Sequence, residues 1–245
     1  MRLRRRPARG PSLMRGSEGL DLSIYARGFV VLARNPVIFV FPLVAVAIEI
    51  GLSFLRAPLF DPLGGYDFGL IGLLFSLING FAFGLALIAA EAAWRGRGGS
   101  LAATWEEGKR KAGGILVATV GFIFVIYVAE LLGGFLGLVG LLVPALAVFF
   151  LIYTIPAAAI GGLPGAAALS ASVERVRGNY LASAVLVIVS LFLYYYVGVF
   201  LGPYISTAVG VFALYATVLI QALVIAYLAV VTARQYDEVA FFRRY

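Results

Sequence analysis

The sequence predicts an all-α, multi-pass membrane protein with six transmembrane helices, and three observations support this fold class. Hydrophobic residues make up 62% of the 245-residue chain and charged residues only 13%, compared with about 25% charged residues in an ordinary soluble domain. A soluble domain of this length cannot bury so much apolar surface. Six segments contain the roughly 20 apolar residues that a helix needs to cross a bilayer. Nearly all of the positive charge falls in the connections on one side of these segments.

The six spans are continuous apolar runs, as expected of helices that must satisfy their own backbone hydrogen bonds in lipid. No ten-residue alternation, typical of membrane strands, competes with them. Pro42 and Pro144 are expected to kink the first and fourth spans. The spans are expected at residues 37–55, 69–93, 114–132, 138–160, 181–201 and 205–231.

Short connections are expected on the outer side. Glycine-rich residues 131–137 predict one hairpin, Gly202 and Pro203 predict a second one, and residues 56–68 form a longer connection with turn-forming residues. The domain boundaries follow from the spans and from composition. Residues 1–19 are expected to be a disordered basic tail, residues 20–233 the six-span domain and residues 234–245 a C-terminal tail.

The distribution of positive charge predicts the orientation. With six spans, every one of the 19 Lys and Arg residues except Arg56 lies on the same side. The positive-inside rule places that side and both termini in the cytoplasm, so we expect a location in the plasma membrane. The net charge of +7 follows from this topology and does not predict nucleic-acid binding. The inner residues expected to contact anionic lipid headgroups are Arg27, Arg34, Trp94, Arg95, Arg97, Trp105, Lys109, Arg110, Lys111, Arg175 and Arg177.

Three amphipathic helices are expected on the cytoplasmic side, before the first, third and fifth spans. Their apolar residues recur every three or four positions opposite charged residues, which is typical of helices that lie in the membrane interface. Ser100 is expected to cap the second of these helices. The apolar stripes are Leu22, Tyr25, Phe29 and Leu32; Leu101 and Trp105; and Leu169, Val173, Val176 and Tyr180.

Each amphipathic helix is expected to end at a break and to continue directly into a span, because Asn, Gly and Pro favour such breaks. One unit of interfacial helix, break, span, outer turn and span would then occur three times. Internal repeats of this kind are common in transporters, which often bind substrate at the repeat interface. The alternative is that the three amphipathic helices look alike without being repeats. The expected breaks are Asn35 with Pro36, Gly113 with Gly114, and Gly178 with Asn179.

Residues 155–179 have a recognisable pattern, in which a span ends near a Pro and a small-residue turn leads into an amphipathic segment. Ala168, Ser172, Arg177, Gly178 and Asn179 mark that segment. The pattern resembles the membrane domain associated with glycerophosphodiester phosphodiesterases and a group of related six-span proteins. The resemblance implies the six-span layout. The catalytic barrel of those enzymes is a separate domain with metal-binding carboxylates and histidines, and this chain has no His.

Four polar residues form a candidate intramembrane site: Glu49, Arg56, Glu130 and Gln221. Ionisable residues are unfavourable within a bilayer, so a function is the first hypothesis for them. Glu49, Arg56 and Glu130 are expected to meet near the outer interface, either as a proton- or cation-binding carboxylate pair or as an ion pair that fixes helix register. Gln221 is expected to make an interhelical hydrogen bond, and Glu91 to pair with nearby arginines at the inner surface.

The absence of both His and Cys excludes disulfides, thiolate nucleophiles, His general bases and zinc sites built on these residues. We therefore expect no metal, no cofactor and no enzymatic activity. The predicted function is that of a non-enzymatic accessory or scaffold protein in lipid or envelope homeostasis, with the bilayer and a protein partner or second copy as its contacts. The alternative is a small-molecule or ion transporter that uses the repeat interface and the outer carboxylates. A cavity that reaches Glu49 would favour transport, and a packed interior would favour the scaffold.

Overall fold

The computed structural model describes residues 21–60 and 67–241. This part of the chain is mostly helical and contains no strand. Among these described residues, four helices are long and apolar enough to cross a membrane, or six if two bent helix pairs each count as one span. The predicted all-α class is therefore confirmed, with four to six candidate membrane spans, and the count of six stays a prediction. The α-helices are α1 (Ser23–Arg34), α2 (Val37–Phe60), α3 (Asp67–Trp94), α4 (Leu101–Gly134), α5 (Leu142–Leu151), α6 (Thr154–Ala159), α7 (Gly165–Gly178), α8 (Tyr180–Tyr195), α9 (Gly202–Val209) and α10 (Ala213–Phe241). Shorter 3-10 or π segments are η2 (Gly137–Leu141), η3 (Tyr196–Leu201) and η4 (Gly210–Phe212).

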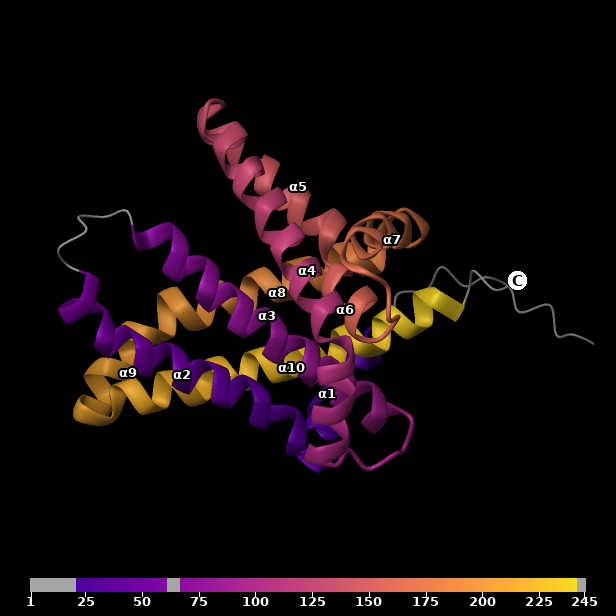
Figure 1. The fold of residues 1–245 in the computed structure, drawn as a ribbon, viewed down its shortest axis with the longest axis horizontal. Helices are drawn as coiled ribbons and strands as arrows, with labels where there is room; N and C mark the ends of the chain where they lie inside the picture. The colour runs from indigo at the N-terminus through magenta and orange to yellow at the C-terminus, as the bar shows by residue number, and fades with distance from the viewer. Residues whose placement is uncertain (1–20, 61–66, 242–245) are drawn as a thin grey trace, which may run out of the picture.

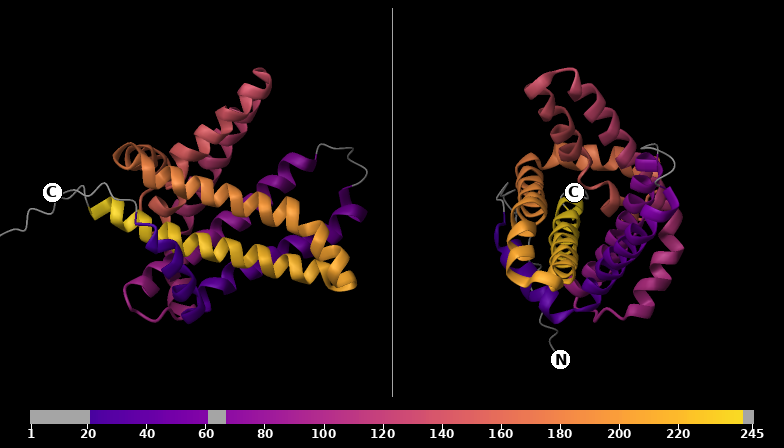
Figure 2. Two further views of the ribbon diagram at one scale, coloured as in Figure 1. Left: turned by 180° about the vertical axis from the view of Figure 1, so that it is seen from behind. Right: turned by 90° about the vertical axis from the view of Figure 1, so that its left-hand side faces the viewer.

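The last helix, α10, lies among the others and packs against α2 and α3 (Figure 1). Seen along the long axis, the other helices are arranged around α10 (Figure 2). The hairpin of α4 and α5 diverges from this bundle, and its tip projects away from α2 and α3 in both figures. The side chain of Phe135 at that tip is 85% exposed. The hairpin therefore presents apolar surface that only a lipid or protein environment would cover.

The interior is built from small side chains where α3, α6 and α10 meet. Ala86, Ala90, Ala157 and Ala226 are fully buried there, around the buried ring of Tyr153. Small residues let helix backbones approach closely, which is how helices associate in lipid. The core is therefore a tightly packed helix junction.

Glycines bring α3 and α4 together. A Cβ at Gly84 would lie 2.9 Å from the Ile115 side chain, and one at Gly80 would clash with Thr119. Gly80 and Gly84 are four residues apart and lie on the same face of α3. Their spacing therefore serves close helix packing, as small residues do in membrane helices.

Two of the three predicted breaks are confirmed. The chain bends by 83° between α1 and α2, at Asn35 and Pro36, and by 112° between α7 and α8, at Asn179. The Asn35 side chain donates a hydrogen bond of 2.9 Å to the Val31 carbonyl, which satisfies a group at the end of α1. Both bends place a short helix across the direction of the helix that follows it.

The predicted break at Gly113 and Gly114 is wrong, because α4 runs without interruption from Leu101 to Gly134. A glycine inside a helix lowers its stability by only about 1 kcal/mol relative to alanine, so the helix can continue through Gly113 and Gly114. A Cβ at Gly114 would lie 3.4 Å from the Leu163 carbonyl oxygen, so this glycine serves a close approach to the α6–α7 connection. Since the middle unit lacks the bend of the other two, the threefold repeat stays a prediction.

Of the two short turns predicted on the outer side, the first is confirmed and the second lies elsewhere. The chain turns after α4 at Gly137, whose φ of +60° suits glycine, as the sequence predicts. The second turn lies at Gly210, with φ of +56°, and not at Gly202 and Pro203, which begin α9. The π-helical segment η3 directly precedes α9, so the chain continues through Gly202 and Pro203 without a turn there.

The fourth apolar segment is broken at Ile152 and Tyr153, between α5 and α6, and not at Pro144. Pro144 is the third residue of α5, where the missing N–H matters little. Pro156 cannot donate to the carbonyl of Ile152, so it explains the break four residues before it. Pro42 lies within α2, which is a single helix, and its kink stays a prediction.

The short helices α1 and α7 pack on the protein mainly through small residues, and their predicted place in the membrane interface stays a prediction. Of the α1 stripe, Leu32 is buried, whereas Phe29 is 61% exposed. The buried face instead contains Gly28, where a Cβ would lie 3.2 Å from Val231 of α10. In α7, Ala168 and Ser172 are buried along with Val176. Small residues therefore face the protein in both helices, and Phe29 of α1 stays exposed.

Candidate functional site

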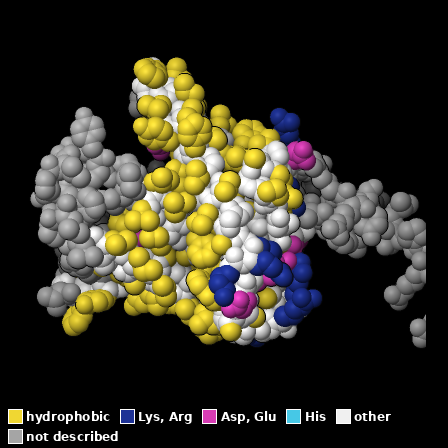
Figure 3. Space-filling model, in the orientation of Figure 1, with side chains coloured by type: hydrophobic (Ala, Val, Ile, Leu, Met, Phe, Trp, Pro, Cys, Tyr) yellow, Lys and Arg dark blue, Asp and Glu magenta, His cyan; other side chains and the backbone are white. Residues whose placement is uncertain are grey.

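Lys and Arg side chains gather at one end of the molecule, next to a largely hydrophobic body (Figure 3). This end contains α1, the α3–α4 connection, the first turns of α4, the end of α7 and the end of α10. We call its cationic residues the basic rim. The basic rim consists of Arg27, Arg34, Arg95, Arg97, Lys109, Arg110, Lys111, Arg175, Arg177 and Arg234.

Seven cationic residues of the rim are exposed, and four of them form no ion pair within the described residues: Arg27, Arg34, Arg97 and Arg177. Arg175 differs, because its guanidinium lies 3.4 Å from the centre of the Tyr236 ring and donates a 3.3 Å hydrogen bond to the Tyr236 carbonyl. This contact fastens α7 to α10. Arg175 was predicted to contact lipid, and the structure gives it a protein-facing role.

At the start of α1, the Asp21 carboxylate accepts a hydrogen bond of 2.9 Å from the backbone N–H of Ser23. Hydrogen bonds from Ser23 lower the pKa of Asp21 below its ordinary value. Asp21 therefore keeps its negative charge at the N-terminus of α1, where helices favour anions.

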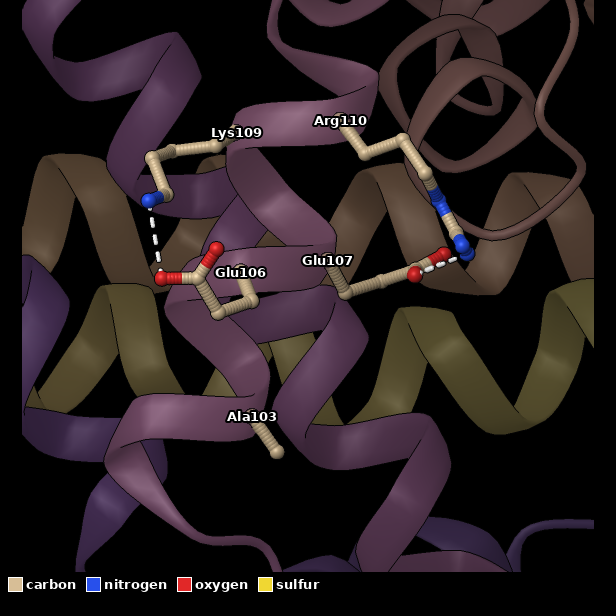
Figure 4. A pocket seen from close by; sticks show the side chains of 5 residues that line it. All are labelled: Ala103, Glu106, Glu107, Lys109 and Arg110. Atoms are coloured by element: carbon tan, nitrogen blue, oxygen red, sulfur yellow. Dashed lines mark hydrogen bonds and ion pairs between the residues drawn. The ribbon is translucent and has the colours of Figure 1, made fainter.

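The first turns of α4 carry paired charges on an exposed helix face (Figure 4). Glu106 and Lys109 are 2.8 Å apart, and Glu107 pairs with Arg110 one residue further on. A shallow depression of about 770 Å³ lies over these side chains and Ala103. All of its lining belongs to one helix, so it is a helix surface. Exposed pairs of this kind contribute about 0.2–1 kcal/mol each.

A second depression, which we call the rim pocket, has a volume of about 380 Å³ and combines residues of three segments. It lies between the end of α3, the first turns of α4 and the end of α6. Three of its side chains are cationic and two are carboxylates. Its lining consists of Ile88, Glu91, Ala92, Arg95, Arg97, Glu107, Lys111 and Ile160.

The end of α3 fixes the arginines of the rim pocket. Gly96 has a φ of +69°, and its N–H donates a 3.0 Å bond to the Ala93 carbonyl. The Arg97 N–H donates a 2.9 Å bond to the Ala92 carbonyl, which completes a Schellman motif. Arg95 lies one turn after Glu91, and the two side chains approach to 2.5 Å. The backbone therefore holds both arginines beside the last turn of α3.

Lys111 lines the rim pocket and connects α4 to α6. Its ammonium donates hydrogen bonds of 2.7 Å to the Ala159 carbonyl and 3.5 Å to the Ile160 carbonyl. It also lies 2.9 Å from a carboxylate oxygen of Glu107. Carbonyls at the end of a helix lack partners within the helix, so the ammonium satisfies them and ties α4 to α6.

The two tryptophans predicted to lie at the inner surface occupy different environments. The indole N–H of Trp94 donates a 2.9 Å hydrogen bond to the Val230 carbonyl, and the Arg234 guanidinium lies 5.6 Å from its ring. Trp105 is 44% exposed and packs edge-on against Phe81. Trp94 therefore anchors α3 to α10, while Trp105 presents an aromatic surface at the same end of the bundle.

Of the predicted cluster, Glu130 does not lie beside Glu49, and the contact of Arg56 with Glu49 stays a prediction. Glu130 is exposed near the end of α4, in the hairpin that diverges from α2 (Figures 1 and 2). The side chain of Arg56 lies outside the described residues. Glu49 is half-buried and accepts a 2.5 Å hydrogen bond from the side-chain amide of Asn79 in α3. Sequence reasoning missed Asn79, although a polar residue within a predicted span was a visible signal.

Two other predicted polar contacts have different outcomes. Gln221 lies half-buried in α10, and its interhelical hydrogen bond stays a prediction. Glu91 pairs with Arg95 as expected, and Arg95 also lies 3.7 Å from Asp237 of α10. Glu91 therefore belongs to a charge network at the end of α3.

The residues of the 155–179 pattern have structural roles. The Ser172 hydroxyl accepts a 3.0 Å hydrogen bond from the Tyr153 N–H and donates a 2.8 Å bond to the Phe150 carbonyl. Ser172 thereby bridges the break between α5 and α6. The Asn179 carbonyl, at the bend after α7, accepts a 2.8 Å bond from the Ser183 hydroxyl. Ser172 therefore holds α7 against the broken segment, and the Asn179 bond lies within the first turn of α8.

No protein-family model, no curated protein and no solved structure matches this chain. The resemblance of residues 155–179 to a known membrane domain therefore stays a prediction. The molecule combines a packed helical body, a basic rim at one end and a rim pocket that contains both signs of charge.

Proposed function

We propose that the protein is a non-enzymatic membrane scaffold whose basic rim binds anionic lipid headgroups at the cytoplasmic surface of the plasma membrane. The observation that carries this proposal is the gathering of Lys and Arg at one end of an apolar helical body (Figure 3). Anionic lipids of the inner leaflet attract such clusters by about 1 kcal/mol for each basic residue near the surface. Both termini would then lie in the cytoplasm.

The dimensions of α4 support this placement. Its 34 residues extend about 51 Å at 1.5 Å per residue, which exceeds the roughly 30 Å thickness of the hydrocarbon core. The charged first turns of α4 would therefore emerge on the cytoplasmic side. The bent helices α1 and α7 would lie in the interface, with exposed aromatic residues such as Phe29 among the headgroups.

The packed interior favours a scaffold over a transporter. Leu87, Ile115 and Leu186 are fully buried, and Tyr153 fills the space between the alanine-rich faces of α3, α6 and α10. A transport pathway requires a water-filled route through the bundle. We infer a role in lipid or envelope homeostasis, in which the diverging α4–α5 hairpin contacts lipid, a protein partner or a second copy.

The experiment extracts the protein from cell membranes with its surrounding lipids, using an amphipathic polymer, and measures the lipid composition. Wild type is expected to retain anionic lipid above its share in the membrane. A variant with Arg27, Arg34, Arg97 and Arg177 replaced by Ala is expected to lose most of this enrichment, because these exposed cations supply it. Glu130→Gln is the control. Equal lipid compositions around wild type and the Arg variant would contradict the proposal.

One observation favours transport as a second candidate function. Glu49 is a half-buried carboxylate within an apolar helix, and it is hydrogen-bonded to Asn79 of the neighbouring helix. Such carboxylates often belong to proton or ion pathways. The test compares proton and ion flux in vesicles containing wild type, Glu49→Gln or Glu130→Gln. A flux that disappears only in Glu49→Gln would establish this candidate, and unchanged flux would exclude it.

A further inference from the structure

The rim pocket contains carboxylates that an anion-binding site does not need. Glu91 and Glu107 line the same depression of about 380 Å³ as Arg95, Arg97 and Lys111. A phosphate alone would be attracted by the three cations and repelled by the two carboxylates. A ligand with one group of each sign would match both sets of side chains.

We propose that the rim pocket binds a phosphoethanolamine headgroup, with the phosphate at Arg95 and Arg97 and the primary ammonium at Glu91 and Glu107. This inference rests on the proposed function in one respect, namely that the basic rim contacts headgroups. It goes further because it names a zwitterionic headgroup with an N–H-bearing amine. The same chemistry occurs in a membrane lipid and in free glycerophosphoethanolamine.

The cationic half of the pocket is preorganised. The Schellman motif at Gly96 fixes the Arg97 backbone against the last turn of α3. Arg97 is exposed, and no ion pair joins it to an acidic residue in the described part of the chain. The Arg95 Nη2 atom is engaged by Glu91, but a guanidinium carries five N–H donors. The two guanidinium groups can therefore both donate to phosphate oxygens, often in pairs.

The carboxylate half of the pocket is partly enclosed. The side chains of Glu91 and Glu107 are 16% and 27% exposed. Arg95 contacts one oxygen of Glu91, while Lys111 and Arg110 each contact a different oxygen of Glu107. A carboxylate has about four lone-pair sites, and a primary ammonium has three donors, so the pocket can accept the amine alongside these contacts.

This arrangement predicts headgroup selectivity. A choline group has no N–H and cannot donate to the carboxylates. A glycerol headgroup has no cation to offset the charge of Glu91 and Glu107. Phosphatidylethanolamine should therefore bind the rim pocket more tightly than either phosphatidylcholine or phosphatidylglycerol does.

The surroundings suit a lipid headgroup. Trp94 precedes Arg95 and is fastened to α10 through the Val230 carbonyl, and tryptophan rings lie preferentially at headgroup level. Ile88 and Ile160 give the pocket an apolar wall. A headgroup in the pocket would thus have its glycerol end next to apolar surface.

The experiment is native mass spectrometry of the full chain in detergent, with an equimolar mixture of dioleoyl phosphatidylethanolamine, phosphatidylcholine and phosphatidylglycerol. Wild type is expected to bind phosphatidylethanolamine several-fold better than phosphatidylcholine. Glu91→Gln and Arg97→Ala are each expected to weaken binding of phosphatidylethanolamine about tenfold, since each removes a charge-assisted hydrogen bond. Glu106→Gln is the matched control, because it removes the same charge from the neighbouring helix face and not from the pocket.

A second arm adds soluble glycerophosphoethanolamine and measures competition. Binding of either the lipid or the soluble compound, lost in Arg97→Ala, supports the proposal and identifies the source of the headgroup. Binding of neither overturns it. Arg97 is exposed and makes no ion pair in the described residues, so this variant keeps the test valid even where Glu91→Gln fails to fold.

The failure of this inference can be distinguished from failure of the proposed function. Equal binding of phosphatidylethanolamine and phosphatidylcholine would overturn the ammonium site. Preferential binding of phosphatidylglycerol that depends on Arg97 and not on Glu91 would also overturn it, while the anionic-lipid scaffold would stand.

Discussion

The hydroxyl of Ser172 accepts a 3.0 Å hydrogen bond from the backbone N–H of Tyr153, at the break between α5 and α6. The same hydroxyl donates to the Phe150 carbonyl at 2.8 Å. Backbone groups released by a broken helix must find partners elsewhere when no water is present. A side chain of the short helix α7 therefore completes the hydrogen bonding of a neighbouring membrane segment.

Replacing Ser172 with Ala is expected to destabilise the protein by about 1–3 kcal/mol, because the buried Tyr153 N–H loses its partner. Thermal unfolding in detergent measures this change. Ser170→Ala is the matched control, since Ser170 lies exposed on the same helix and bonds only within it. Equal stability of the two variants would contradict the role assigned to Ser172.

The glycine face of α3 gives a second prediction. Gly84→Ala is expected to destabilise the protein by about 1–3 kcal/mol, since its Cβ would lie 2.9 Å from the stiff Ile115 side chain. Gly72→Ala in the same helix meets nothing within 4 Å and should be neutral or slightly stabilising. Urea or thermal unfolding in detergent compares the two. Similar losses at both positions would show that close packing of α3 on α4 is not the cause.

Lys111 is expected to contribute to stability more than its neighbours on α4. Lys111→Met leaves the Ala159 carbonyl without its 2.7 Å hydrogen bond, a loss of about 1–3 kcal/mol for a bond to a charged group. Lys109→Met removes only an exposed pair with Glu106, worth about 0.2–1 kcal/mol. The difference between the two unfolding free energies checks the assignment. A larger loss for Lys109→Met would contradict it.

The first turn of α1 is expected to depend on pH through Asp21, whose pKa is lowered by hydrogen bonds from Ser23. A carboxyl group whose pKa is lowered in the folded state stabilises the fold at pH values above its unfolded pKa, which is about 3.9 for Asp. That contribution is lost as the pH falls through the lower folded value. Hydrogen exchange of the first α1 amides should therefore be protected equally at pH 5 and 7, after correction for intrinsic rates, and less protected at pH 3. Asp21→Asn should abolish this dependence.

The sequence predicted the membrane class and most helices, because continuous apolar runs have few alternatives in lipid. The breaks at Asn35 and Asn179 were predicted from a local signal, because Asn readily ends a helix. Gly113 and Gly114 were misjudged because a glycine pair also serves close packing, as Gly114 does against Leu163. Local signals alone do not separate these two uses.

The site was predictable only in its local part. The pairing of Glu91 with Arg95 follows from their spacing on one helix. The bond between Lys111 and the Ala159 carbonyl joins residues 48 positions apart, and it depends on how α4 packs against α6. The contact of Glu49 with Asn79 depends likewise on the packing of α2 against α3. Tertiary contacts of this kind leave no periodic trace in the sequence.

The central claim is that the basic rim binds anionic headgroups. Its most direct test is native mass spectrometry of the full chain with equimolar phosphatidylglycerol and phosphatidylcholine at low and at physiological ionic strength. We expect wild type to prefer phosphatidylglycerol, with a preference that falls as salt screens the exposed arginines. The variant with Arg27, Arg34, Arg97 and Arg177 replaced by Ala should show little preference at either salt concentration. Equal binding of the two lipids by wild type at low ionic strength would contradict the claim.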